Sequence, residues 1–250
     1  MRLIHAMKYH LFIIGMLRMC FIPFAESQEK FLTVGLQLKP IIPSGLFRTD
    51  NVFKSQENMF YSITTTFGYS GGMMIRKEFS KRFSFETGIN FTKRNYNLDI
   101  IDNDSIVDGH IFAGYSDFSI INYEIPLLGL LYLRIGERWH MNTSVGVSMD
   151  FFPSDISTYD SYFSHLALRN HWLQLAGVVN HGYELRTDKS GMIYFGGTLH
   201  WPFTIIYRSF IDYKTGLLLK DQTTLDLKGN YFTIDVRYYF PERQEKKRRK

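Results

Sequence analysis

The stretch that decides the fold is "FTIDVRYYF", residues 232–240, near the end of this 250-residue chain. Every second residue is large and apolar: Phe232, Ile234, Val236, Tyr238 and Phe240. A Thr, an Asp, an Arg and a second Tyr lie between them. Successive side chains of a β-strand point to opposite faces of the sheet, so this alternation predicts a strand with one apolar and one polar face.

The same period of two recurs along most of the chain. No helical period of comparable quality follows residue 30. The sequence therefore predicts an all-β fold whose eight strands cover residues 31–42, 60–79, 82–94, 117–135, 138–152, 172–186, 192–207 and 229–240.

The predicted connections alternate strictly between long and short. Tight turns are expected at 80–82, 136–138 and 187–191, and long polar loops at 43–59, 101–114, 153–171 and 209–227. An antiparallel up-and-down barrel with both chain ends on the short-turn side produces this rhythm. It is the plan of outer-membrane barrels, which have short periplasmic turns and long extracellular loops.

The apolar faces fit a bilayer in length and composition. Residues 83–91 and 232–240 each span nine residues, and a tilted membrane strand needs about 9–11. Aromatic residues gather at both ends of the strands, as in interfacial girdles. In a secreted lipocalin-like barrel, the runner-up, the apolar face would point inward. The girdles, the loop rhythm and the many charges on the other face favour an eight-stranded transmembrane barrel over residues 28–240.

Residues 1–27 have the layout of a secretory signal peptide. Arg2 and Lys8 precede apolar residues 11–17 and 19–25, and small residues follow before Gln28. A retained membrane anchor is the alternative. The chain has a single Cys, within this segment, so a mature chain would form no disulfide.

Basic residues are concentrated at the C-terminus. The net charge is +5, but residues 241–250 alone hold six basic and two acidic residues. Outside this tail, the predicted strands carry no basic face, which argues against nucleic-acid binding. The topology places this tail in the periplasm, where it is either solvated or in contact with anionic lipid or a protein partner.

The polar face of the strands predicts an ionic network inside the barrel. An eight-stranded barrel is just wide enough for side chains to fill, and buried charges need partners. The turn centred on Lys81 places Arg76 opposite Glu86, so we expect an ion pair there. The expected lumenal network is Arg76, Glu86, Arg94, Glu124, Arg134, Glu184, Arg186, Asp235 and Arg237.

Three residues conflict with a regular barrel. His181 falls on the lipid face, which requires a register shift or a neutral imidazole bonded to a neighbour. Pro126 and Pro202 each remove a ladder donor, so we expect β-bulges at both. The segment "GYSGG", residues 68–72, is expected to form a bulge or a close-packing site.

No enzyme, metal or cofactor motif emerges. Nothing fixes a spacing between nucleophile and base, as the motif of a serine hydrolase would. The acidic segment 99–109 lacks the Gly and Glu positions of an EF-hand loop. We therefore expect no catalytic residues, no metal and no cofactor. The pieces of a lipid-modifying site would be His140, Ser144, Ser148, Ser164, His165 and His171.

The stretch "YEIPLLGLLYLRIG", residues 123–136, resembles the PorT-like family of small outer-membrane β-barrel proteins from Gram-negative bacteria. Residues 123–128 match the Glu/Ile-Pro-Leu-Leu strand of that family, while Gly129 and Leu130 stand where a basic residue is common. The strand-and-loop plan of 31–240 is similar as well. The resemblance implies an eight-stranded barrel in the outer membrane and implies no activity.

These observations predict a structural, anchoring or interaction protein of the bacterial outer membrane, with both termini in the periplasm. Its alternatives are a narrow pore or component of a secretion or transport system, and a lipid-modifying enzyme. Tyr238 and Phe240 resemble the terminal aromatic signal for insertion. The expected partners are outer-membrane lipid, the barrel-assembly machinery, and an envelope protein bound through the long loops or the tail.

Overall fold

The computed structural model describes residues 32–43, 51–56, 58–107, 110–187, 189–215 and 218–241. The predicted signal peptide, residues 1–27, lies outside this description, as does the predicted tail apart from its first residue. The described residues form thirteen β-strands. None of them belongs to a helix that is long and apolar enough to cross a membrane.

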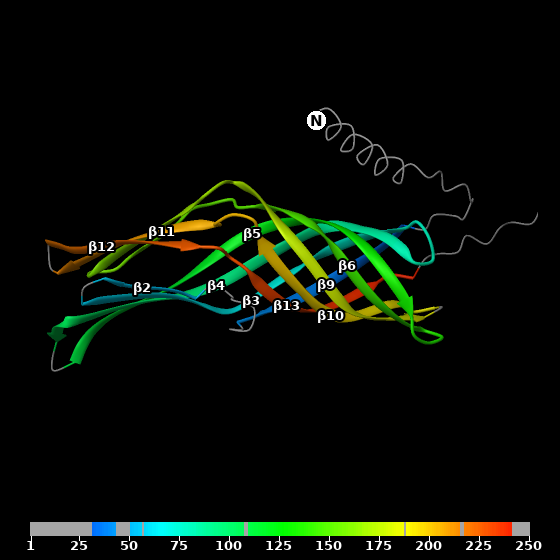
Figure 1. Ribbon diagram of the computed structural model, residues 1–250, viewed down its shortest axis with the longest axis horizontal. Helices are drawn as coiled ribbons and strands as arrows, with labels where there is room; N and C mark the ends of the chain where they lie inside the picture. The colour runs from blue at the N-terminus through cyan, green and yellow to red at the C-terminus, as the bar shows by residue number, and fades with distance from the viewer. Residues whose placement is uncertain are drawn as a thin grey trace, which may run out of the picture. The chain divides into compact units, whose positions relative to one another are not determined.

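Eight of these strands close into an antiparallel ring (Figure 1). β3 pairs with β1, and β1 pairs with β13, which joins the first and last strands of the ring as the sequence predicts. The predicted eight-stranded barrel is confirmed. The ring runs in the order β1 (Leu32–Ile42), β13 (Tyr231–Tyr239), β10 (Gly191–Pro202), β9 (Leu173–Thr187), β6 (Trp139–Phe151), β5 (His110–Arg134), β4 (Phe83–Val107) and β3 (Met59–Glu78).

The outside of this ring is apolar on every strand. Phe83 and Phe195 are 57% and 60% exposed, and each lies in the alternating pattern read from the sequence. Exposed apolar side chains include Leu36, Met73, Phe83, Leu131, Val145, Leu175, Phe195 and Val236, one from each strand. An apolar surface of this extent is unstable in water and suits a lipid environment.

The long connections predicted as polar loops are mostly β-structure, which corrects that prediction. β2 (Val52–Gln56) pairs with the start of β3, and the β4–β5 hairpin continues well beyond the length that crosses a bilayer. β7 (Ile156–Tyr159), β8 (Phe163–Arg169), β11 (Tyr207–Thr215) and β12 (Leu218–Leu227) form a separate four-stranded sheet in the order β12-β11-β8-β7. In Figure 1, β2, β11 and β12 lie together at one end of the ring.

The two sheets pack against each other at that end through a shared apolar core. We call this part the distal sandwich: β2, the adjoining parts of β3, β4 and β5, and the sheet of β7, β8, β11 and β12. Asp221 of β12 accepts hydrogen bonds from Gln56 and Tyr61 of the ring sheet, at 3.1 and 2.7 Å. The core includes Tyr61, Ile63, Leu98, Ile100, Phe118, Phe163, Ala167, Ile211, Leu225 and Leu227.

A register shift in β3 explains why Tyr61 and Ile63 are in this core. Strict alternation through the predicted strand 60–79 would instead place them on the lipid face. Thr66 pairs with Asn95, but Tyr69 pairs with Lys93, so one extra residue is inserted between them. One extra residue moves the following side chains to the other face. Odd-numbered residues therefore face inward before the shift and outward after it. The bulge expected at 68–72 adjoins this point.

The expected bulges at the prolines are not present in the ladders. Pro126 keeps an unbroken register with β6 opposite Ser148, and the β4–β5 register is the same on both sides of it. On the β4 side the pairs of Ile125 and Pro126 are missing, so the lost donor of Pro126 costs hydrogen bonds and causes no register shift. Pro202 is the last residue of β10, where the strand ends.

His181 is exposed on the outer face, as the alternation predicts, and it has a neighbour to bond. Its Nδ1 lies 2.8 Å from Oγ1 of Thr143, which is the paired residue on β6. This hydrogen bond reduces the cost of placing a polar ring on an apolar surface. This was the arrangement expected if the register did not shift.

Candidate functional sites in the lumen and the distal sandwich

A network of buried ion pairs fills the lumen nearest the short turns. Arg76 donates to Glu86 at 3.0 Å and to Glu184 at 2.6 Å, and all three side chains are inaccessible to solvent. Arg237 donates to Glu86 at 2.6 Å and to Asp235 at 2.8 Å. Every carboxylate of this group therefore faces at least one guanidinium, as buried ion pairs require.

Aromatic rings lie against the charged groups of the lumen. The guanidinium of Arg76 lies 3.9 Å from the centre of the Tyr239 ring, and that of Arg237 lies 4.7 Å from the Tyr194 ring. The Tyr239 hydroxyl also donates to Glu86 at 2.5 Å. Cation–π contacts and these hydrogen bonds hold the charged groups in place.

Arg186 extends the network toward the short turns. Its guanidinium bonds Glu184 at 2.7 Å and Glu78 at 3.2 Å, and it lies 4.7 Å from the Tyr132 ring. Glu78 and the tyrosines are not part of the network predicted from the sequence. The alternation places Glu78 on the inner face, but a tyrosine on that face gives no signal that it will stack on a cation.

Arg134 corrects the predicted network. It lies at the end of β5 with an exposed side chain, and it donates to the carbonyl of Gly136 in the adjoining turn at 2.9 Å. No described carboxylate forms an ion pair with it. Position 134 is on the inner face by alternation, but it is too close to the barrel rim to be enclosed.

A second polar cluster lies in the lumen next to the distal sandwich. His200 Nε2 lies 3.1 Å from Oδ2 of Asp150, and the Tyr231 hydroxyl donates to Glu124 at 3.1 Å. Arg94 lies 3.8 Å from Asp150, and its guanidinium lies 4.6 Å from the Tyr231 ring. Of these residues, Arg94 and Glu124 belong to the lumenal network predicted from the sequence, whereas Asp150, His200 and Tyr231 do not.

The same cluster contains a serine, a histidine and an aspartate, which raises the question of catalysis. Ser148 Oγ lies 3.1 Å from Nε2 of His200 and donates to Oδ1 of Asp150 at 2.7 Å. Serine and aspartate thus share one ring nitrogen, whereas a hydrolytic triad places them on opposite nitrogens. All three side chains are also buried. This arrangement does not form a nucleophile–base–acid relay.

The other candidate catalytic residues are scattered. Ser144 and His140 lie on β6, Ser164 and His165 on β8, and His171 precedes β9. His165 is fully buried against the Phe118 ring, 4.8 Å between ring centres. Burial lowers the pKa of His165 from 6.5 to about 4. A neutral imidazole in an apolar core is a structural residue of the distal sandwich.

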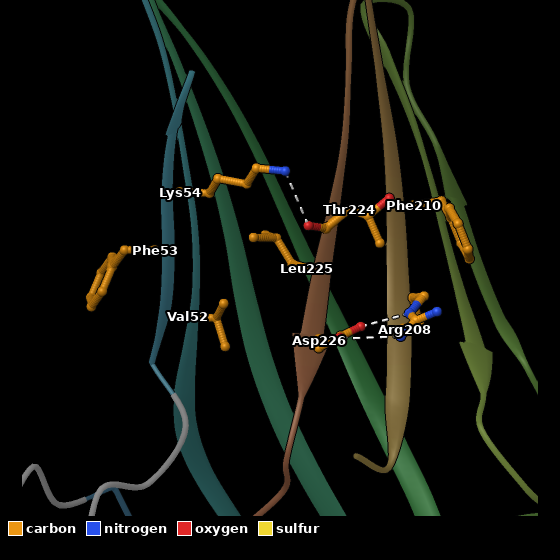
Figure 2. Close-up of a pocket in the computed structure, with 8 residues that line it drawn as sticks. All are labelled: Val52, Phe53, Lys54, Arg208, Phe210, Thr224, Leu225 and Asp226. Atoms are coloured by element: carbon orange, nitrogen blue, oxygen red, sulfur yellow. Dashed lines mark hydrogen bonds and ion pairs between the residues drawn. The ribbon is translucent and has the colours of Figure 1, made fainter. Parts of the chain in front are cut away.

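The distal sandwich has an open cleft between two sheet edges (Figure 2). β2 is the last strand of the ring sheet and β12 is the last strand of the four-stranded sheet, so neither has a second neighbour among the strands that the structure describes. The cleft has a volume of about 530 Å³. Its lining residues are Val52, Phe53 and Lys54 of β2, Arg208 and Phe210 of β11, and Thr224, Leu225 and Asp226 of β12.

Polar contacts mark the two sides of this cleft. The Lys54 side chain reaches across to the carbonyl of Thr224 at 3.5 Å, and Arg208 forms a pair with Asp226 at 2.7 Å (Figure 2). That hydrogen bond raises the pKa of Arg208. Phe53 is 58% exposed at the rim, where its side chain points away from β12. Unpaired strand edges beside exposed aromatic and charged groups are typical of surfaces that bind extended polypeptides.

The proposed insertion signal lies on the outer face at the end of β13. Tyr238 and Phe240 are both partly exposed, and their rings meet edge to face at 5.3 Å between centres. Phe240 donates its backbone N–H to the carbonyl of Val34, so the pairing with β1 extends to this residue.

No family model and no curated protein matches this chain. Among solved structures, it is similar to the translocator domain of the autotransporter NalP from Neisseria meningitidis. The match covers 94% of this chain and 98% of that chain, with 11% sequence identity and a TM-score of 0.36. A likeness this weak carries no functional argument, so the function has to be argued from the geometry of this chain.

Proposed function

We propose that this protein is an outer-membrane β-barrel that anchors the distal sandwich and presents it to a protein partner. The observation that carries the proposal is the apolar outer face on all eight strands of a closed ring. A closed barrel has no free strand edge in lipid, which an open sheet could not achieve. The resemblance of residues 123–136 to the PorT-like family supports the same location.

The barrel itself is proposed to be a plug and an anchor. The ion pairs of Arg76, Glu86, Glu184 and Arg237 cross the lumen and are stacked with tyrosines, which supports a closed interior. The start of β1 and the end of β13 share the barrel end that carries the short turns. By the usual plan of such barrels, that end faces the periplasm and the distal sandwich faces the outside.

Fractionation and bilayer recording test this function. We expect the protein in the outer membrane, with heat-modifiable migration on a gel, and no channel steps in planar bilayers. Arg76→Ala combined with Glu86→Ala removes a neutral pair and is expected to produce small conductance steps. A soluble periplasmic protein would contradict the anchor, and wild-type channel steps would favour the pore.

The partner is proposed to bind along the open cleft. β2 and β12 offer unpaired backbone groups, and Phe53 offers an exposed aromatic contact on the β2 side, across the cleft from the Arg208–Asp226 pair (Figure 2). An added strand would pair with such an edge through its main chain and use neighbouring side chains for specificity. We propose no enzymatic activity, because Ser148, His200 and Asp150 lack relay geometry.

A charge at the cleft rim should abolish partner binding without unfolding the protein. Phe53→Asp is expected to reduce recovery of the partner by at least tenfold after cross-linking on whole cells, since it replaces an exposed aromatic contact. Tyr159→Asp is the matched control, because Tyr159 is 76% exposed on β7, the other edge of the four-stranded sheet. Equal recovery with both variants would place the partner surface elsewhere.

A further inference from the structure

Three buried side chains with metal-binding chemistry converge in the lumen beside the distal sandwich. They are Glu124 of β5, Asp150 of β6 and His200 of β10, and none is more than 1% exposed. One potential ligand atom from each lies within 4.8 Å of the other two. Glu124 and Asp150 are paired residues on neighbouring strands, which brings their carboxylates together.

The spacing matches that of ligands around one ion. Asp150 Oδ2 and His200 Nε2 are 3.1 Å apart. Two ligand atoms at roughly 2.0–2.2 Å from a zinc ion, with angles between square and tetrahedral, are about 3.0–3.6 Å apart. Asp150 and His200 are already at this separation. A small side-chain rotation of Glu124 would complete a site with three protein ligands.

The position of Glu124 independently points to a cation. Its Oε1 is buried and has no hydrogen-bond partner among the described residues, while its Oε2 accepts only from the Tyr231 hydroxyl. The nearby Arg94 donates to the carbonyl of Gly229 at 2.9 Å and forms its ion pair with Asp150. One guanidinium therefore stands beside two carboxylates. An ionised carboxylate without a partner is costly in a buried site.

The surrounding residues form the kind of outer shell that positions metal ligands. Tyr231 bonds Glu124 through its hydroxyl and stacks on the His200 ring, with 4.4 Å between ring centres. Ser148 donates to Oδ1 of Asp150 at 2.7 Å, which leaves Oδ2 directed toward His200. Hydroxyl groups thus orient Glu124 and Asp150, whereas His200 is held by ring stacking, and its Nδ1 has no hydrogen-bond partner among the described residues.

We propose that Glu124, Asp150 and His200 bind one divalent transition-metal ion of the zinc type. Imidazole favours zinc and its neighbours over calcium and magnesium, which prefer oxygen ligands throughout. The ion would link β5, β6 and β10 at the level where the barrel passes into the distal sandwich. Its role is structural, because the site is enclosed and Arg94 lies beside it.

The test uses the full mature chain without a histidine tag, refolded in detergent, stripped with a chelator and titrated with Zn²⁺. We expect one equivalent to bind and to raise the thermal unfolding midpoint. Glu124→Gln and His200→Gln should each weaken binding by at least 100-fold, and Tyr231→Phe should weaken it by about 10- to 100-fold, as for outer-shell partners. His181→Gln, on the outer face, should bind like the wild type.

Two further measurements complete the test. Heat-modifiable migration verifies that each variant has folded, and the absorption spectrum of bound Co²⁺ reports nitrogen and oxygen ligands directly. The proposal is overturned if folded wild-type protein binds no Zn²⁺ or if Glu124→Gln and His200→Gln bind it unchanged. Binding of Ca²⁺ in preference to Zn²⁺ would also overturn it, since that result indicates an oxygen-only site.

Discussion

Replacing Arg76 by methionine is expected to destabilise the folded barrel by about 3–5 kcal/mol. The guanidinium makes two short ion pairs, with Glu86 and Glu184, and contacts the Tyr239 ring at 3.9 Å. Methionine keeps much of the side-chain volume but removes the positive charge and the donors. The two buried carboxylates, Glu86 and Glu184, would then each lose one positively charged partner in an enclosed lumen. Urea unfolding of the refolded protein in lipid vesicles measures the change.

Arg134→Met is the matched control for this measurement. Arg134 lies on β5 near the same barrel end, but it is exposed and contacts only turn carbonyls, so we expect less than about 0.5 kcal/mol. Adding Glu86→Gln and Glu184→Gln to Arg76→Met should recover part of the loss, because the carboxylates are then neutral. If Arg76→Met behaves like Arg134→Met, the ion pairs do not stabilise the lumen.

Acidification is expected to loosen the distal sandwich while the barrel remains folded. His165 is buried in the apolar core and its ring nitrogens have no hydrogen-bond partner among the described residues. Burial lowers its pKa from 6.5 to about 4. The unfolded state therefore binds the proton more readily. The stabilisation is complete above about pH 6.5 and is lost as the pH falls toward 4, by roughly 3 kcal/mol in total.

Hydrogen exchange resolved by strand measures this effect. After correction for the intrinsic pH dependence of exchange, amides of β8 and β11 should lose protection between pH 6.5 and 4.5, while those of β9 and β10 should not. His165→Phe should remove the acid sensitivity, and the exposed His171→Phe should leave it intact. Equal loss of protection in His165→Phe would assign the effect to other groups.

The barrel was predictable for two reasons. Its strands share a two-residue period, and the connections between them alternate between short and long. The clean alternation of 232–240 and 83–91 appears unchanged in β13 and β4, and Arg76 is paired with Glu86 across the turn at Lys81. Such local features need no knowledge of distant contacts. The prediction for Arg134 was wrong because alternation assigns a residue to one face of the sheet but not to a depth below the barrel rim.

The distal sandwich was missed because its signals are short and interrupted. Phe163, His165 and Ala167 alternate on one face of β8, as Leu225 and Leu227 do on β12, but each run is brief and lies among polar residues. The register shift beyond Thr66 also places Tyr61 on the face opposite to that predicted. A two-residue period cannot be extended through a bulge whose position is unknown.

The last strand of the chain also completes most of the interior. β13 brings Asp235, Arg237 and Tyr239 to the ion pairs near the short turns, and Tyr231 to the cluster around His200. Until this strand is in place, Glu86 lacks one of its two arginines, and Glu124 lacks the Tyr231 hydroxyl. β13 therefore both pairs with the edges of β1 and β10 and completes the ion pairs of the interior. A barrel that lacks β13 therefore has open edges on β1 and β10 and an incomplete set of ion pairs in its interior.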